Sequence, residues 1–182
     1  MEAETAKILA GVGAVLSIVG PFGYGIVGII GLILVLVGLL SLADYFKDSE
    51  MRQNTIYWLI FAIIGVIALV ATFVLGFFAL SRFVVGPHLY TRVTSLTAVN
   101  VLALIAGLVV AEVFFILAAS RLRRVYAALA QRTGEGLFNT AGTLYFWGAV
   151  LTIVLVGLIL LFVSWILAAV AFFSAKLPPP PQ

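Results

Sequence analysis

Cysteine and charged residues are what this sequence most lacks. Of its 182 residues, none is cysteine, 9% are charged and one, His88, is histidine. Without cysteine there are no disulfides, zinc–thiolate sites or iron–sulfur clusters, and a single histidine cannot form a histidine-rich metal site. We therefore expect no metal centre and no cofactor.

The scarcity of charge accompanies an excess of apolar residues. Hydrophobic residues make up 64% of the chain, whereas soluble domains are about half apolar and about a quarter charged. A soluble fold of this length has too little interior to bury so much apolar surface. We expect an all-α, polytopic bundle of transmembrane helices, a single domain over residues 1–182 with a proline-rich tail at 177–182.

Long apolar runs mark the expected membrane spans, which are residues 5–20, 26–43, 56–80, 96–119 and 148–173. The first run is about 24 Å long as a helix, which is short for a hydrocarbon core of about 30 Å. Whether residues 5–20 cross the bilayer therefore stays open. Residues 137–147 end in Tyr145, Phe146 and Trp147, which suggest an interfacial aromatic belt. Five spans are favoured, and four remain an alternative.

An internal repeat raises the alternative of six spans. Residues 13–19 read GAVLSIV and residues 148–154 read GAVLTIV, while 31–46 and 157–172 both begin with GLIL. Either two leucine-rich stretches agree by coincidence, or a helix pair is duplicated and the second copy bends near Leu155–Gly157. That turn would be wholly apolar and would leave backbone groups unpaired in lipid, so we keep five spans.

Lysine and arginine set the expected orientation, because they are enriched in cytoplasmic loops. With five spans, seven lie on one side: Lys7, Lys47, Arg52, Arg121, Arg123, Arg124 and Arg132. Three lie on the other side: Arg82, Arg92 and Lys176. We therefore expect a protein of the cell membrane with its amino terminus and the loops 44–55 and 121–136 in the cytoplasm.

Three stretches carry a family resemblance. They are AKILAGVGAVL near the amino terminus, the block GLILVLVGLLSLADYFKD, and the closing FNTAG…GAVLTIVLVGLILL…AFFS. They resemble the small archaeal and bacterial membrane proteins catalogued as domain of unknown function 996. The resemblance covers both ends of the chain and implies a prokaryotic membrane protein, with no catalytic residue to transfer.

Glu112 and Asn100 form the candidate intramembrane polar site. Glu112 lies nine residues before Arg121, about 13 Å from the end of its helix and near mid-membrane. A carboxylate there costs several kcal/mol unless it is protonated, paired or hydrated. It is either a proton- or cation-binding group or a neutral acid bonded to a neighbouring helix. Asn100 points about 120° away and is expected to hydrogen-bond between helices.

Small residues recur at every fourth position on two consecutive helices. They are Ala68, Thr72 and Gly76 on one helix, and Ala103, Gly107 and Ala111 on the next. Such spacing lets helix backbones approach closely, although small residues are also common in membrane helices in general. We expect these faces to pack against each other or against another subunit.

Arginines cluster after the fourth run. Arg121, Arg124 and Arg132 lie on one helical stripe, with Arg123 beside it. They suggest contact with anionic lipid or a partner protein, or simply the usual positive charge of a cytoplasmic loop. Nothing resembles a basic nucleic-acid-binding domain.

No phosphate-binding loop, HExxH helix or nucleophile elbow occurs in the sequence, so we do not expect an enzyme. We expect a non-catalytic structural or accessory protein, in contact with membrane lipids, that packs against copies of itself or a larger membrane complex. The alternative is a small ion- or proton-coupled transporter or channel that uses Glu112.

Overall fold

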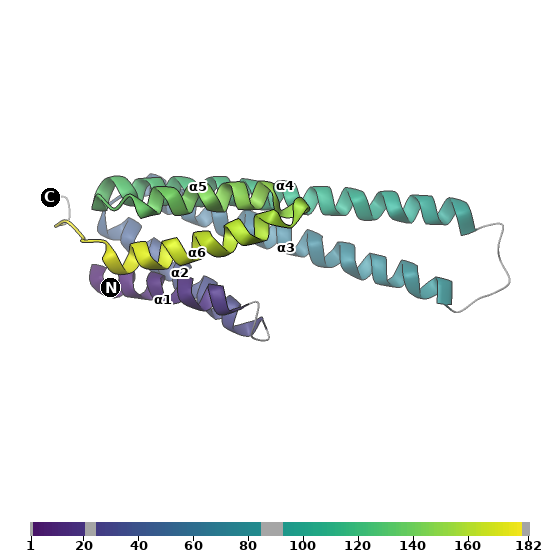
Figure 1. The fold of residues 1–182 in the computed structure, drawn as a ribbon, viewed down its shortest axis with the longest axis horizontal. Coiled ribbons are helices and arrows are strands. Elements are labelled where there is room, and N and C mark those ends of the chain that lie inside the picture. Colours follow the sequence, from purple (N-terminus) through teal and green to yellow (C-terminus); the bar gives the residue numbers. More distant parts are fainter. Residues whose placement is uncertain (1, 21–24, 85–92, 180–182) are drawn as a thin grey trace. The chain divides into compact units, whose positions relative to one another are not determined.

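The computed structural model describes residues 2–20, 25–84 and 93–179, with side chains described except at 79–99. All regular structure in this part of the chain is helical, which confirms the all-α prediction (Figure 1). The elements are α1 (Ala3–Val19), α2 (Ile26–Tyr45), α3 (Ser49–Val84), α4 (Val93–Thr133), α5 (Leu137–Val150), the 3-10 turn η2 (Thr152–Val154) and α6 (Val156–Ser174). The predicted loop between Arg82 and Arg92 lies largely outside the described residues.

The chain divides into two compact units. The larger unit comprises Met1–Leu59 and Ile116–Gln182, and the hairpin unit comprises Ile60–Phe115. Helices α3 and α4 run through both units, so a single domain stays a prediction. Helix α4 continues past the fourth apolar run and ends at Thr133, before Gly134 with its φ of +73°.

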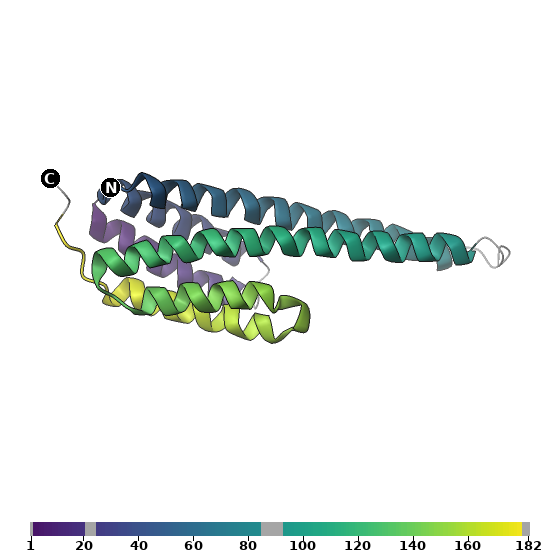
Figure 2. The same ribbon diagram turned by 90° about the horizontal axis from the view of Figure 1, so that it is seen from above.

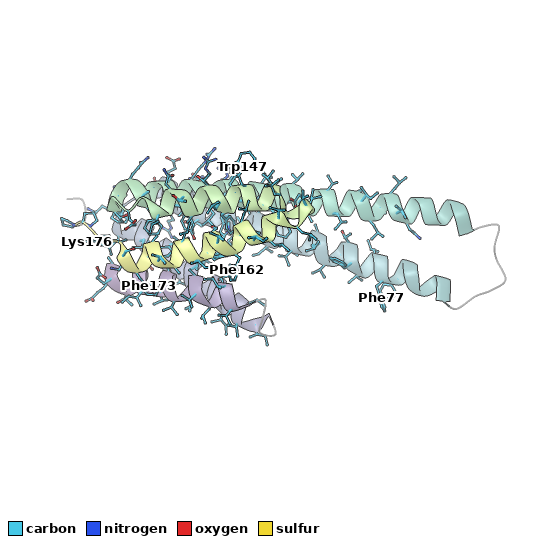
Figure 3. All side chains as sticks on the ribbon, viewed as in Figure 1. Phe77, Trp147, Phe162, Phe173 and Lys176 are labelled. Atoms are coloured by element: carbon cyan, nitrogen blue, oxygen red, sulfur yellow. The ribbon has the colours of Figure 1, made fainter. Side chains whose placement is uncertain are left out.

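Within the described part of the chain, four helices are long and apolar enough to cross a membrane. They are Ile26–Tyr45, Ser49–Phe78, Asn100–Thr133 and Val156–Ser174. Large apolar side chains cover their outer faces, and Phe77, which projects outward from α3 in Figure 3, is 70% exposed. Such surface is stable in hydrocarbon rather than water, which indicates a membrane protein.

The interpretation of residues 148–173 as one tilted span is wrong. Helix α5 ends at Val150, the chain reverses through η2, and α6 begins at Val156, so that α5 and α6 lie side by side (Figures 1 and 2). Residues 137–147 therefore form most of the first arm of a hairpin, and their interfacial position stays a prediction. The rings of Tyr145 and Trp165 meet edge to face between the arms, 5.6 Å apart. The bend falls where the six-span alternative placed it.

The apolar turn pairs several of its own backbone groups. The Leu151 N–H donates to the Trp147 carbonyl at 3.0 Å, and the Gly157 N–H donates to the Leu151 carbonyl at 3.1 Å. The hydroxyl of Thr152 donates to the Gly148 carbonyl at 2.8 Å. The N–H groups of Val154 and Leu155 donate in 3-10 geometry to the carbonyls of Leu151 and Thr152, both at 3.0 Å. These bonds lower the cost of a bend in apolar surroundings, which weakens the argument against it.

The two copies of the repeat make matching hydrogen bonds. Ser17 and Thr152 occupy equivalent positions in the first block of the repeat, as do Gly13 and Gly148. The Ser17 hydroxyl donates to the Gly13 carbonyl at 2.9 Å, and the Thr152 hydroxyl donates to the Gly148 carbonyl at 2.8 Å. Each bond joins a hydroxyl at the end of the hairpin's first arm to the backbone carbonyl four residues before it.

The arms of the two hairpins also approach at equivalent glycines. A methyl group built on Gly31 would lie 2.7 Å from the carbonyl oxygen of Gly13, and one built on Gly157 would collide with the carbonyl oxygen of Gly148. Seven residues further along α2, a methyl group built on Gly38 would lie 2.7 Å from the Ala6 carbonyl oxygen.

Ser164 is the counterpart of Gly38 in the second hairpin. Its hydroxyl donates to the carbonyl of Ala141 at 2.7 Å, and Ala141 is the counterpart of Ala6 in the same register. These shared contacts favour duplication of a helix pair over a coincidental similarity of two leucine-rich stretches. The α1–α2 and α5–α6 pairs make equivalent contacts at equivalent positions of the repeat.

Both ends of the described chain lie at the same end of the larger unit (Figure 1). The Lys7 ammonium donates to the Ala175 carbonyl at 3.0 Å, and the Tyr45 hydroxyl donates to the Pro178 carbonyl at 2.9 Å. These contacts contradict the placement of Lys176 on the side opposite Lys7, which the five-span interpretation required. The reason is the reversal after α5, which returns α6 and the start of the predicted tail to the end where the chain enters.

Close packing of the second hairpin gives a first prediction. Gly157→Val places a branched side chain against the Gly148 backbone, and overpacking of this kind costs about 1–3 kcal/mol. We expect a lower Tm in detergent, followed by circular dichroism. The matched control is Gly136→Val, because a methyl group at Gly136 meets no atom within 4 Å. An equal loss in both variants would contradict the packing argument.

The tip of the same hairpin gives a second prediction. Ile153 is 74% exposed and Leu155 is 71% exposed, while the 14 residues of α5 extend only about 21 Å. A tip so apolar should remain in hydrocarbon. We expect Ile153→Cys, in this cysteine-free chain, to resist a membrane-impermeant maleimide in intact vesicles and to react in detergent. Lys47→Cys should react in vesicles of one orientation; labelling of position 153 to the same extent would contradict the expectation.

Candidate functional site

Glu112 lies on α4 within the hairpin unit, at the edge of the buried stripe of that helix. Its neighbour Ala111 is buried, whereas Val109 and Val113 are each about half exposed. The Oε1 atom of Glu112 is inaccessible and accepts no hydrogen bond from any described residue. A carboxyl oxygen without a partner in an apolar segment is costly, so this group calls for an explanation.

Asn100 lies in a different place from Glu112. It lines a cleft of about 340 Å³ between α3 and α4, together with Thr72, Ala103 and Gly107. Twelve residues of helix separate it from Glu112, which corresponds to about 18 Å along the axis. The structure therefore does not bring the two predicted polar residues into one site.

The predicted small-residue faces largely meet each other within the hairpin unit. A methyl group on Gly107 would collide with the Thr72 side chain, and one on Gly76 would lie 2.8 Å from a Leu104 methyl carbon. The Thr72 hydroxyl donates to the Ala68 carbonyl at 2.7 Å, which bonds it within its own helix. Ala111 is buried, whereas Ala103 is exposed at the cleft.

One packing residue was absent from the predicted set. A methyl group on Gly65 would lie 2.9 Å from the Phe115 ring and 3.4 Å from the Ala111 carbonyl oxygen. Gly65 lies seven positions before Thr72, which is two helical turns, so its spacing places it on the same face. A search for every fourth residue misses it, because 65 and 68 are three apart.

Two of the four predicted arginines are held by partners in the larger unit. Arg121 donates to the Asn54 side-chain oxygen at 3.3 Å, and its guanidinium lies 5.2 Å from the centre of the Tyr57 ring. Arg132 pairs with Asp48 at 3.0 Å. These contacts join the end of α4 to the start of α3, so the two arginines have a structural role there.

The other two arginines differ from each other. The guanidinium of Arg123 lies 5.6 Å from the centre of the Phe146 ring, a cation–π distance that joins α4 to α5. Arg124 is exposed and has no hydrogen bond, ion pair or ring contact with any described residue. The structure thus separates one unpartnered arginine from three that are engaged.

Among the described residues, no three histidine, cysteine, aspartate or glutamate side chains gather where they could hold a metal ion. The polar groups that the structure places in apolar surroundings are single carboxyl, amide or hydroxyl groups.

The packing of the hairpin unit gives a third prediction. Cysteines replacing Gly76 and Leu104 should form a disulfide on oxidation, because these positions face each other and the chain has no other cysteine. Adding Gly107→Val should lower the yield, since the new side chain collides with Thr72. Ala106→Val, at an exposed position, is the matched control. Equal yields with both variants would show that Gly107 does not set the helix separation.

Comparison with known proteins places the chain in a family. The model of the family described as "Protein of unknown function (DUF996)" matches residues 27–166. The uncharacterised protein MJ1644 of Methanocaldococcus jannaschii is 33% identical over 174 residues, which cover 96% of this chain and 93% of the relative. No solved structure matches the chain. The resemblance seen in the sequence is confirmed, and the chain belongs to the DUF996 family of proteins of unknown function.

Proposed function

We propose that this chain is a non-catalytic integral membrane protein that assembles with a second membrane-embedded chain, either a copy of itself or a subunit of a larger complex. The observation that carries the proposal is Glu112, whose Oε1 atom is inaccessible and unpartnered among the described residues. Side-chain hydrogen bonds between transmembrane helices satisfy such groups. A helix from another chain is the partner that this carboxyl group lacks.

The surface beside Glu112 supports the same proposal. Leu108, Val109 and Val113 lie on α4 within one turn of Glu112 and are about half exposed. No described helix of the hairpin unit covers this face. A partner helix laid across these side chains would bring its own polar groups within reach of the carboxyl group and would exclude lipid from it.

The distribution of charge supports a cell-membrane location with one end in the cytoplasm. Eight lysines and arginines belong to the larger unit: Lys7, Lys47, Arg52, Arg121, Arg123, Arg124, Arg132 and Lys176. Lys7 and the residue before Lys176 are in contact, so the amino terminus and the carboxyl-terminal segment share a side. The positive-inside rule then favours a cytoplasmic position for residues 44–55 and 121–136.

A second candidate function uses the same carboxyl group. In a small ion- or proton-coupled transporter or channel, Glu112 would bind the transported proton or cation. Its partial exposure favours this role, because a carrier group must be reached from outside the packed stripe. Asn100 is too far along α4 to share the site, so Glu112 would act without it.

Substitution of Glu112 gives the fourth prediction. We expect Glu112→Leu to weaken self-assembly or complex formation by about three- to tenfold in dissociation constant, the effect of one intramembrane hydrogen bond. Glu112→Gln should retain assembly, because an amide also bonds between helices. Mass measurement in mild detergent over a dilution series tests this, with Val113→Leu as the control. A strictly monomeric parent that carries no partner would overturn the proposal.

Proton flux in liposomes separates the two candidates. If the chain is a transporter, Glu112→Gln should abolish flux that the parent protein supports, because an amide cannot carry a proton. Flux in a monomeric parent, lost in Glu112→Gln, would establish the second candidate over the first. Flux that is unchanged in Glu112→Gln would exclude this residue from transport.

A further inference from the structure

A polar groove lies in the larger unit, where α3 begins and α4 ends. It has a volume of about 510 Å³ and is lined by charged or amide side chains. These are Asp48, Glu50, Asn54, Arg124, Gln131 and Arg132. The buried Met51 and two alanines of α4 form its apolar wall. The groove thus combines charge of both signs with an apolar side.

Two of the charged residues neutralise each other. Arg132 pairs with Asp48 at 3.0 Å, and the second carboxylate oxygen of Asp48 accepts the Met51 N–H at 2.9 Å, at the start of α3. The Arg132 guanidinium also lies 5.8 Å from the centre of the Phe46 ring. This pair is occupied in holding the two helix ends together and leaves no charge for a ligand.

The remaining two charges are unpaired. Glu50 and Arg124 line the groove from opposite helices, and both are exposed. Neither forms an ion pair or hydrogen bond with a described residue, so they do not approach each other within 4 Å. A carboxylate and a guanidinium held apart in one groove are complementary to a ligand with a positive and a negative group.

The groove lies at the depth expected of lipid headgroups. One turn before Arg124, Arg121 lies over the ring of Tyr57, and aromatic rings and arginines are typical of the membrane–water boundary. Between Asn100 and Arg121, α4 carries Glu112 as its one ionisable residue. The helix therefore leaves the hydrocarbon region shortly before it reaches the groove.

We propose that this groove binds the headgroup of an aminophospholipid, with the phosphate on Arg124 and the ammonium group on Glu50. Guanidinium is a good donor to phosphate oxygens, and a carboxylate accepts from a primary ammonium group. A lipid that carries phosphate without an amine would leave Glu50 unpaired beside an anion. The proposal is independent of the assembly through Glu112, because it concerns the other unit of the chain.

Native mass spectrometry of the detergent-purified chain tests the proposal. With equal amounts of phosphatidylethanolamine and phosphatidylglycerol, we expect the parent to retain the ethanolamine lipid about fivefold more, the effect of one charge-assisted bond. Arg124→Gln should lower retention of both lipids, whereas Glu50→Gln should remove only the preference. Arg52→Gln and Glu2→Gln, outside the groove, are the matched controls and should behave as the parent.

Three results would overturn the proposal. The first is equal retention of the two lipids by the parent. The second is a loss in Arg52→Gln as large as that in Arg124→Gln, which would indicate general surface charge. The third is displacement of the lipid by an equal concentration of O-phosphoethanolamine, which has no acyl chains and would assign the groove to a soluble ligand. Circular dichroism of each variant checks that a loss of binding is not a loss of fold.

Discussion

Backbone hydrogen bonding in hydrocarbon is the constraint on which the rest of the structure depends. A peptide group that lacks a partner there is costly, so a chain that reverses within the membrane must pair its own groups in the turn. The turn between α5 and α6 pairs several of its groups through a 3-10 segment, a left-handed Leu155 with φ of +61°, and a Thr152 hydroxyl bonded to the Gly148 carbonyl of α5. A turn with no charged residue is therefore compatible with an apolar environment.

Close approach of helix backbones is the second constraint on the structure, and it is met in both hairpins. In both hairpins a glycine of the first arm lies against a glycine of the second, with a hydroxyl bonded to the same backbone carbonyl. Small contact residues allow dispersion and hydrogen bonding to hold helices together where the hydrophobic effect does not. These contacts involve the glycines and the serine–threonine pair that the two copies of the repeat share, among matches that are otherwise mostly apolar.

Charge and polarity are divided between the two units. The larger unit holds eight of the ten lysines and arginines, and most of its arginines are engaged by rings, an amide or a carboxylate. The hairpin unit holds the other two, Arg82 and Arg92, and its described side chains are apolar apart from a few single groups such as Glu112 and Asn100. Unpartnered polar atoms in such a setting are the features most informative about function, since an apolar surface alone indicates only lipid.

The sequence by itself determined the helical class, the membrane environment and the family. These follow from composition and from the length of apolar runs, which are local properties. The spacing of small residues also identified the face on which Gly107 and Thr72 meet, although it missed Gly65, whose place in the pattern is three residues rather than four from Ala68.

Only the tertiary structure decided how residues 137–174 are threaded and which charges are free. The repeat allowed a hairpin, but no residue type in this apolar turn predicts a chain reversal, because the hydrogen bonds of the turn are made largely by the backbone. The side on which Lys176 lies depended on that turn. Likewise, four arginines within twelve positions look equivalent in sequence. Partners on other helices distinguish Arg124 from the rest, and such contacts between distant segments are set by packing.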